Sequence, residues 1–213
     1  MIQPALKNAV VRAIETIMAA AVIVGFSGCA TESQPALTPG RTVILAFGDS
    51  LTYGRGVRTR DSYPAILEKI TGFTVINAGV RGETTEDGLK RLPRLLELCK
   101  PAAVVLCEGG NDMLQMKLEA DTKANLDKMI ELIHASGASV VLVGVPYLRL
   151  PFETADYYLD LARKHNIQCQ ATVLKRLLSV KSLKSDEIHL NKQGYAMLAQ
   201  AVSELLEKAM EKK

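Results

Sequence analysis

Short apolar runs alternate with amphipathic stretches along most of this 213-residue chain, and no other feature constrains its fold as strongly. The run at 102–107 is apolar throughout, as expected for a parallel strand that helices cover on both faces. Strands are predicted at 42–47, 73–77, 102–107, 139–145 and 167–170. Helices are predicted at 63–70, 85–98, 122–135, 155–165 and 191–208. The alternation predicts an α/β fold: a three-layer αβα sandwich around a flavodoxin-like parallel sheet of about five strands.

A proline interrupts the periodicity of one predicted helix. Pro93 falls inside the stretch 85–98, where leucines otherwise recur at helical spacing. Proline has no N–H to donate, and its ring clashes with the preceding turn. We therefore expect the helix to be kinked or interrupted at this position.

Composition indicates one soluble globular domain and argues against a nucleic-acid partner. The chain is 48% hydrophobic and 23% charged, with a net charge of +3. Removal of residues 1–28 would take away Lys7, Arg12 and Glu15 and leave +2. So small a charge, without a run of basic residues, does not provide the electrostatic footprint that nucleic-acid binding requires.

The N-terminal region has the order of a secretory signal. Lys7 and Arg12 precede an uncharged apolar run at 17–26, and Ser27-Gly28-Cys29 follows. This run is shorter than the roughly 20 residues of a membrane-spanning helix. A cysteine directly after two small residues resembles a bacterial lipobox, in which the signal is cut before Cys29 and the sulfur is lipidated. The alternatives are an ordinary signal peptide cut nearby and an uncleaved anchor.

The lipobox reading divides the chain into a signal peptide at 1–28, a tether at 29–40 and a folded domain at 41–213. It predicts export to the bacterial cell envelope, with a lipid anchor on the periplasmic face. Ala30 stands where an inner-membrane retention aspartate could stand, so resemblance to enterobacterial sorting favours the outer membrane. A soluble periplasmic or secreted protein is the alternative.

The remaining cysteines give no sign of a disulfide or a metal site. Cys99, Cys107 and Cys169 are odd in number and fall on separate predicted elements. There is no CxxC motif and no Cys/His cluster in the sequence. We expect these cysteines to be small buried hydrophobes, and we expect no metal and no cofactor.

Chemically capable residues follow the predicted strands. Ser50 follows the strand at 42–47, Gly82 the strand at 73–77 and Asn111 the strand at 102–107, while Asp186 and His189 lie in a late loop. Because the carboxyl ends of parallel strands share one edge of a sheet, we expect these residues to meet. A serine beside a histidine with an upstream aspartate is typical of nucleophilic catalysis, and Gly82 and Asn111 can donate hydrogen bonds to an oxyanion. We expect Asp186 to raise the pKa of His189 by favouring the imidazolium.

Each of these residues also has an ordinary structural explanation. Ser50 could cap the next helix, Gly82 could be a turn glycine, and Asn111 could cap a turn. His189 could begin a helix whose dipole Asp186 favours. Convergence of separate segments on one sheet edge favours the functional interpretation. Asp49 and Asp112 are expected to organise their turns rather than act as bases.

Four short blocks follow one another along the chain: Gly48-Asp49-Ser50-Leu51, Gly82, Gly109-Gly110-Asn111-Asp112 and Asp186-Glu187-Ile188-His189. In this order they resemble the blocks of the SGNH (GDSL) hydrolase family, in its arylesterase, acyl-CoA thioesterase and lysophospholipase branch. The resemblance covers 41–213 and implies a serine esterase that acts through an acyl-enzyme. It implies Ser50 as nucleophile, His189 as base and Asp186 as orienter. It also implies an oxyanion hole from the N–H groups of Ser50 and Gly82 and the amide of Asn111.

The substrate is predicted from two apolar loops. Residues that could line an acyl site are Met113, Leu114, Tyr147, Leu148 and Phe152. Ordinary loop packing is the alternative. We expect short- to medium-chain esters, aryl esters, thioesters or lysophospholipids as small-molecule partners, and a membrane partner only through the lipid anchor. A cell-wall carbohydrate O-deacetylase and a non-catalytic ligand-binding lipoprotein are the other possibilities.

Overall fold

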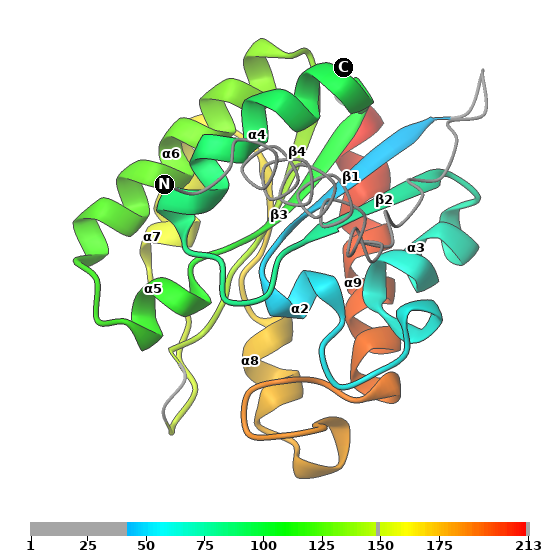
Figure 1. The fold of residues 1–213 in the computed structure, drawn as a ribbon, viewed down its shortest axis with the longest axis vertical. Helices are drawn as coiled ribbons and strands as arrows, with labels where there is room; N and C mark the ends of the chain where they lie inside the picture. The colour runs from blue at the N-terminus through cyan, green and yellow to red at the C-terminus, as the bar shows by residue number, and fades with distance from the viewer. Residues whose placement is uncertain (1–41, 148–149, 212–213) are drawn as a thin grey trace, which may run out of the picture. The chain divides into compact units, whose positions relative to one another are not determined.

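The predicted parallel sheet is confirmed. The computed structural model describes residues 42–147 and 150–211 (Figure 1). Within these, five strands form one sheet in the order β2-β1-β3-β4-β5, and every neighbouring pair is parallel. The strands are β1 (Val43–Gly48), β2 (Thr74–Gly79), β3 (Ala103–Cys107), β4 (Ser139–Val143) and β5 (Gln168–Gln170). This is the flavodoxin-like order that the sequence predicted.

Helices cover both faces of the sheet. One layer holds α3 (Tyr63–Thr71) and α9 (Lys192–Glu211), which pack against each other. The opposite layer holds α4 (Thr85–Cys99), α6 (Glu119–Ala135) and α7 (Tyr157–His165), and Figure 1 shows the sheet between the two layers. The shorter elements are α2 (Ser50–Tyr53), η1 (Thr59–Asp61), α5 (Gly110–Leu114), α8 (Val173–Leu178) and η2 (Lys181–Leu183).

The core lies on both faces of β1 and β3. All five residues of β3 are completely buried, as are Ile44, Leu45, Ala46 and Phe47 of β1. Burial on both faces explains why these strands read as continuous apolar runs rather than as alternating patterns. Cys99 and Cys107 are buried, Cys169 is partly buried, and all three are free thiols. No helix in 42–147 or 150–211 is long and apolar enough to cross a membrane.

Two glycines let α2 lie close to the ends of the central strands. A Cβ added at Gly79 would lie 2.1 Å from the backbone nitrogen of Tyr53, in α2. At Gly48, a Cβ would lie 2.2 Å from the carbonyl oxygen of Cys107. Backbone cannot withdraw from such contacts as a flexible side chain can. The end of β1 and helix α2, whose first residue is Ser50, are therefore held against β3 and β2.

Of the two outcomes expected at Pro93, a kink or an interruption of the helix, the interruption is wrong. Helix α4 runs without a break from Thr85 to Cys99. Pro93 lies on the exposed side of the helix, where solvent can hydrogen-bond the carbonyl that lacks its N–H donor. The buried residues Leu92 and Leu96 hold the helix against the core on either side of the proline.

Element boundaries shift by up to three residues from those predicted. Helix α6 begins at Glu119 rather than at 122, and β4 ends at Val143 rather than at 145. Two short helices, α2 and α5, replace the turns expected after β1 and β3. Both start at the carboxyl edge of the sheet, so they bear directly on the candidate site.

Pro93→Ala is expected to stabilise the protein. Alanine restores the missing N–H donor, and proline costs about 3 kcal/mol in a helix interior. Loss of proline's restriction on the unfolded chain offsets this by about 0.4–1 kcal/mol. Urea unfolding of the full chain should show a gain of about 2 kcal/mol. Arg94→Ala, at the next exposed position, is the control and should change stability little; a loss of stability in Pro93→Ala would contradict the analysis.

Candidate active site

Ser50 is presented at the carboxyl end of β1 by a short capped helix. Asp49 is the N-cap of α2, and its Oδ1 accepts a hydrogen bond from Leu51 N at 2.9 Å. Ser50 is thus the first residue of α2. The alternative explanation, in which Ser50 caps this helix, is wrong because Asp49 is the cap. Its Oγ lies 2.9 Å from His189 Nε2, across 139 positions of sequence. A serine hydroxyl at this distance from an imidazole nitrogen can transfer its proton to it.

Asp186 holds the other side of the His189 ring. Nδ1 of His189 lies 2.8 Å from both Oδ1 and Oδ2 of Asp186. Oδ1 also accepts hydrogen bonds from the backbone N–H groups of Ile188 at 3.0 Å and His189 at 2.9 Å. With Nδ1 directed to the carboxylate, Nε2 is left to face Ser50. The structure therefore brings together the three residues predicted from separate ends of the chain.

Burial outweighs the effect of Asp186 on the pKa of His189. The pKa of His189 is lowered from its ordinary value, chiefly because burial penalises the imidazolium. His189 is only 4% exposed. The Asp186 carboxylate raises the pKa of His189, but the charges of Arg55 and Arg81 lower it again. The prediction of a raised pKa was wrong because sequence spacing gave the nearby carboxylate but not the burial.

Asp186 itself stays ionised over a wide pH range. Burial alone would raise its pKa, but the hydrogen bonds from Ile188 and His189 and the charge of the His189 ring lower it overall. Arg55 Nε lies 3.8 Å from Asp186 Oδ2. Sequence reasoning missed Arg55, which follows α2 by two positions and carries no motif of its own.

Besides Ser50, the predicted oxyanion donors are Gly82, in the segment between β2 and α4, and Asn111, the second residue of α5. Gly82 adopts φ +79°, a left-handed conformation that favours glycine, and a Cβ added there would meet no heavy atom within 4 Å. The space beside the Gly82 backbone is therefore open. Asn111 Nδ2 donates to the backbone oxygen of Glu83 at 2.8 Å and to Asp49 Oδ2 at 3.3 Å. Asn111 is thereby tied to the residue after Gly82 and to the residue before Ser50.

Asp49 and Asp112 organise their turns, as predicted. Asp112 accepts hydrogen bonds from Thr85 N at 2.8 Å and Thr85 Oγ1 at 2.6 Å, which joins α5 to the start of α4. Burial, followed by the charges of Glu83 and Asp112, raises the pKa of Asp49 to about 7, although the Leu51 N–H opposes the shift. Both aspartates are buried and contribute to the geometry around Ser50.

A buried ion pair behind the Gly82 loop was missed from the sequence. Glu83 is paired with Arg91, whose Nε and Nη2 each lie 2.5 Å from a Glu83 carboxyl oxygen. Arg91 also donates to the Ala78 carbonyl at 2.7 Å and stacks over the Phe47 ring at 4.0 Å. The spacing of eight residues between Glu83 and Arg91 is not a helical i,i+4 pair, so no local pattern indicated it.

The residues predicted to line an acyl site differ in their burial, and the structure does not bring all of them to one surface. Phe152 is buried in the core, and Tyr147 is partly buried, with its hydroxyl donating to Glu119 Oε2 at 2.7 Å. Met113 packs against the core, whereas Leu114 is 51% exposed. Leu148 lies outside the described residues. Ordinary packing accounts for Phe152, while Leu114 and its neighbours leave apolar surface beside α5.

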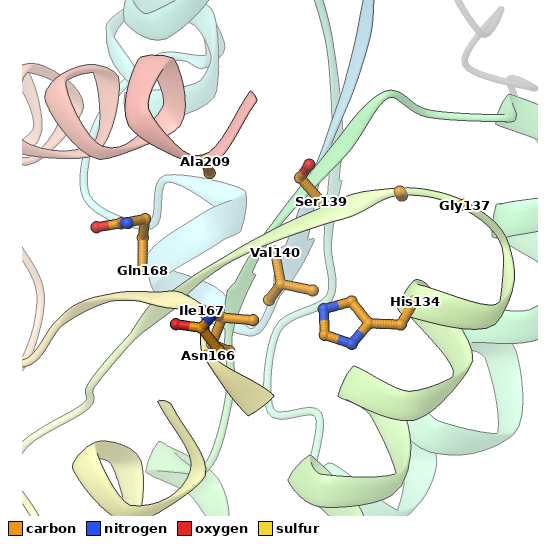
Figure 2. Close-up of a pocket in the computed structure, with 9 residues that line it drawn as sticks. His134, Gly137, Ser139, Val140, Asn166, Ile167, Gln168 and Ala209 are labelled. Atoms are coloured by element: carbon orange, nitrogen blue, oxygen red, sulfur yellow. The ribbon is translucent and has the colours of Figure 1, made fainter. Parts of the chain in front are cut away.

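A separate cavity lies away from this site. Figure 2 shows it near the amino ends of β4 and β5, where it has a volume of about 290 Å³. Ser139 and Gln168, the first residues of those strands, line it together with His134 and Asn166. The amino ends of parallel strands lie at the opposite edge of the sheet from Ser50. We therefore place the candidate site at the hydrogen-bonded Ser50–His189 pair, where a nucleophile and a base are in contact.

The GDSL-like Lipase/Acylhydrolase family matches residues 46–197, which span β1 to the first part of α9. The chain belongs to this family. It is 32% identical over 179 residues to an arylesterase from Vibrio mimicus, covering 78% of this chain and 88% of the relative. It is 27% identical over 175 residues to Thioesterase 1/protease 1/lysophospholipase L1 of Escherichia coli strain K12, covering 77% of this chain and 83% of the relative.

Solved structures agree with this assignment. The crystal structure of TesA matches with a TM-score of 0.71 and 28% identity, covering 79% of this chain and 99% of TesA. The protein is an SGNH/GDSL hydrolase, an enzyme of the esterase/thioesterase type.

The activity is expected to persist to lower pH than an unperturbed histidine would allow. Neutral His189 is the form that can accept a proton, and its lowered pKa extends that form toward acid. Asp186→Asn removes a charge that raises this pKa, so the acid limb of kcat should move further down while kcat falls. Arg55→Gln removes a charge that lowers it and should move the limb up. Rate–pH profiles measure both; shifts in the same direction would contradict the assignment.

Proposed function

We propose that this protein hydrolyses carboxylic esters or thioesters through an acyl-enzyme formed on Ser50. The observation that carries the proposal is the continuous contact from Ser50 Oγ through the His189 ring to the Asp186 carboxylate. A serine that only capped a helix would not need a buried histidine at 2.9 Å. The family membership supports the same reaction class.

In the proposed mechanism, His189 Nε2 accepts the Ser50 proton while Oγ attacks the carbonyl carbon. The carbonyl oxygen becomes an oxyanion, and the backbone N–H groups of Ser50 and Gly82 stabilise it. The Asn111 amide joins them by turning one N–H away from its longer contact, 3.3 Å to Asp49 Oδ2. The imidazolium then gives its proton to the departing alcohol or thiol, and the acyl group stays on Ser50. Water repeats the sequence and releases the carboxylic acid.

The charge distribution favours this mechanism at neutral pH. A lowered pKa keeps His189 neutral and ready to accept a proton. During attack, the ionised Asp186 stabilises the imidazolium that forms beside it. Arg55 and Arg81 add positive potential near the pair, which favours a developing negative charge on the substrate oxygen.

We propose short- to medium-chain acyl esters, aryl esters, thioesters or lysophospholipids as substrates. Relatives named arylesterase and thioesterase/lysophospholipase support this range. Exposed Leu114, at the end of α5, and Leu118, before α6, supply apolar surface that we propose for an acyl chain. Activity on acetylated polysaccharide but not on longer acyl esters would instead favour a carbohydrate O-deacetylase.

Export and lipid anchoring belong to the same proposal. Residues 1–28 would be the signal peptide, 29–40 the tether and 41–213 the hydrolase domain, with Cys29 carrying the lipid. Residues 1–41 lie outside those the structure describes, so the support is the order of basic, apolar and small residues in the sequence. The enzyme would then act at the periplasmic face of the envelope, at the outer membrane.

Ser50→Ala is expected to abolish hydrolysis across a p-nitrophenyl ester chain-length series while the fold remains intact. His189→Ala should lose nearly as much, and the double variant should be little worse than either, because the two side chains act as one unit. Thr71→Ala, on α3 and away from the site, is the control. A Ser50→Ala protein that kept most of its activity, or that still reacted with a serine-directed phosphonate, would refute the assignment of the nucleophile. No hydrolysis by the natural chain would instead favour a ligand-binding protein.

Cys29→Ala is expected to abolish labelling by palmitate and to release the protein from the membrane fraction, or to block its processing. Several acyl chains give stable anchoring, whereas a single myristoyl chain binds only marginally. Cys169→Ala is the matched control and should label as the natural chain does. Equal labelling of Cys29→Ala and the natural chain, or none in either, would leave a soluble exported enzyme.

A further inference from the structure

A completely buried carboxyl group lies beside the site and has no donor to satisfy it. Glu108 directly follows β3 and is 0% exposed. Neither Oε1 nor Oε2 accepts a hydrogen bond from any donor in the described part of the chain. Its backbone is fixed, because its carbonyl oxygen accepts a hydrogen bond from Tyr158 Oη at 2.7 Å. An ionised carboxylate without donors in such a place is very costly.

The neighbour of Glu108 is another carboxyl group. Glu83, which is 6% exposed, is one of the groups that act directly on the Glu108 carboxyl group, although neither carboxylate has a hydrogen to offer the other when both are ionised. Glu83 is already held by the two nitrogens of Arg91. Two ionised carboxylates repel, so a hydrogen bond between them requires one proton. Because Arg91 stabilises the charge on Glu83, that proton belongs on Glu108.

The electrostatic surroundings agree with this placement. Burial, followed by the charges of Asp49 and Glu83, raises the pKa of Glu108 well above its ordinary value, and Arg91 opposes the shift only in part. The titratable and charged groups that face Glu108 are Asp49 after β1, Glu83 after β2, Arg91 on α4 and the Cys107 thiol at the end of β3.

We propose that Glu108 keeps a proton in the folded protein, donates a hydrogen bond through it to the Glu83 carboxylate, and thereby acts as a positioning residue for the oxyanion donors. Glu83 directly follows Gly82, and its backbone oxygen accepts the hydrogen bond of Asn111 at 2.8 Å. Two of the three proposed donors therefore depend on where residue 83 is held. Glu108 touches no reacting atom and acts through Glu83. Its kinetic role rests on the proposed function, but its protonation does not.

The protonation is tested by the pH dependence of stability. Above the ordinary pKa of a glutamate, the unfolded chain releases a proton that folded Glu108 keeps, so stability falls as pH rises. Glu108→Gln mimics the protonated acid, since its amide can donate to Glu83 and it has no proton to lose. As the pH rises from 5.5 to 7.5, the folding equilibrium constant of the protein with the natural Glu108 should fall about tenfold per pH unit relative to that of the Glu108→Gln variant.

This comparison is made by urea unfolding of the full chain with Ser50→Ala in both proteins, so that catalysis plays no part. Asp49 titrates in both proteins and largely cancels. A stability difference that does not change over this pH range would mean that folded Glu108 is ionised, and would overturn the inference. Failure of the proposed function would appear instead as hydrolysis surviving Ser50→Ala, which this measurement does not use.

The positioning role is tested by kinetics with Ser50 restored. Glu108→Gln should keep kcat within about twofold of the natural chain. Glu108→Leu has a side chain of similar size but no hydrogen-bond donor, and it should lower kcat by at least about tenfold. Deleting one oxyanion donor outright lowers kcat by about 10²–10³, and displacing the donors should cost part of that factor. KM should change little, because oxyanion contacts strengthen only in the transition state.

The outcomes are distinct. Natural kcat in a folded Glu108→Leu protein, or a loss confined to KM, would remove the positioning role. If Glu108→Leu does not fold, Glu108→Gln decides: nearly natural kcat together with the pH-dependent stability difference supports the inference, and a kcat loss of tenfold or more in Glu108→Gln overturns it.

Discussion

The candidate site depends on the parallel register of the three central strands. Gly48 at the end of β1 pairs with Gly79 at the end of β2 and with Cys107 at the end of β3. The three strands therefore end level with one another, and the segments that follow them emerge side by side. Ser50, Gly82 and Asn111 come from those segments. A slipped register would separate the Ser50 hydroxyl from Gly82 and Asn111, the oxyanion donors proposed on the other two strands' segments. The hydrogen bonds of the sheet therefore set the geometry of the site.

The same edge concentrates buried charge to an extent unusual for a protein interior. Asp49, Glu83, Glu108 and Asp112 are all nearly inaccessible to solvent. Arg91 neutralises Glu83, and Asp112 is satisfied by the N–H and hydroxyl donors of Thr85. Burial, followed by the charges of Glu83 and Asp112, raises the pKa of Asp49 to about 7, so this group carries only part of its charge at neutral pH. Buried polar groups of this kind cost stability, and their hydrogen bonds rigidify the loops that hold Asn111.

Burial also decides the properties of the histidine. A carboxylate 2.8 Å from Nδ1 raises the pKa of His189, but desolvation and the two arginines lower it more. The orienting function of Asp186 survives this balance, because the hydrogen bond fixes the ring whether or not the net pKa rises. The His189 ring is therefore neutral at physiological pH, with Nε2 facing Ser50. A histidine with a strongly raised pKa would be protonated at this pH and could not accept the serine proton.

The sequence by itself determined the fold class, the strand order and the residues that meet at the site. Apolar periodicity reflects burial on both faces, and parallel topology carries strand ends to a common edge, so both follow from local pattern and connectivity. Only the tertiary structure decided the continuity of α4 through Pro93, the lowered pKa of His189, the Arg91–Glu83 ion pair and the burial of Glu108 near it. Each of these depends on which groups lie within a few ångströms and how far water is excluded. Sequence spacing does not specify either quantity for residues on different elements.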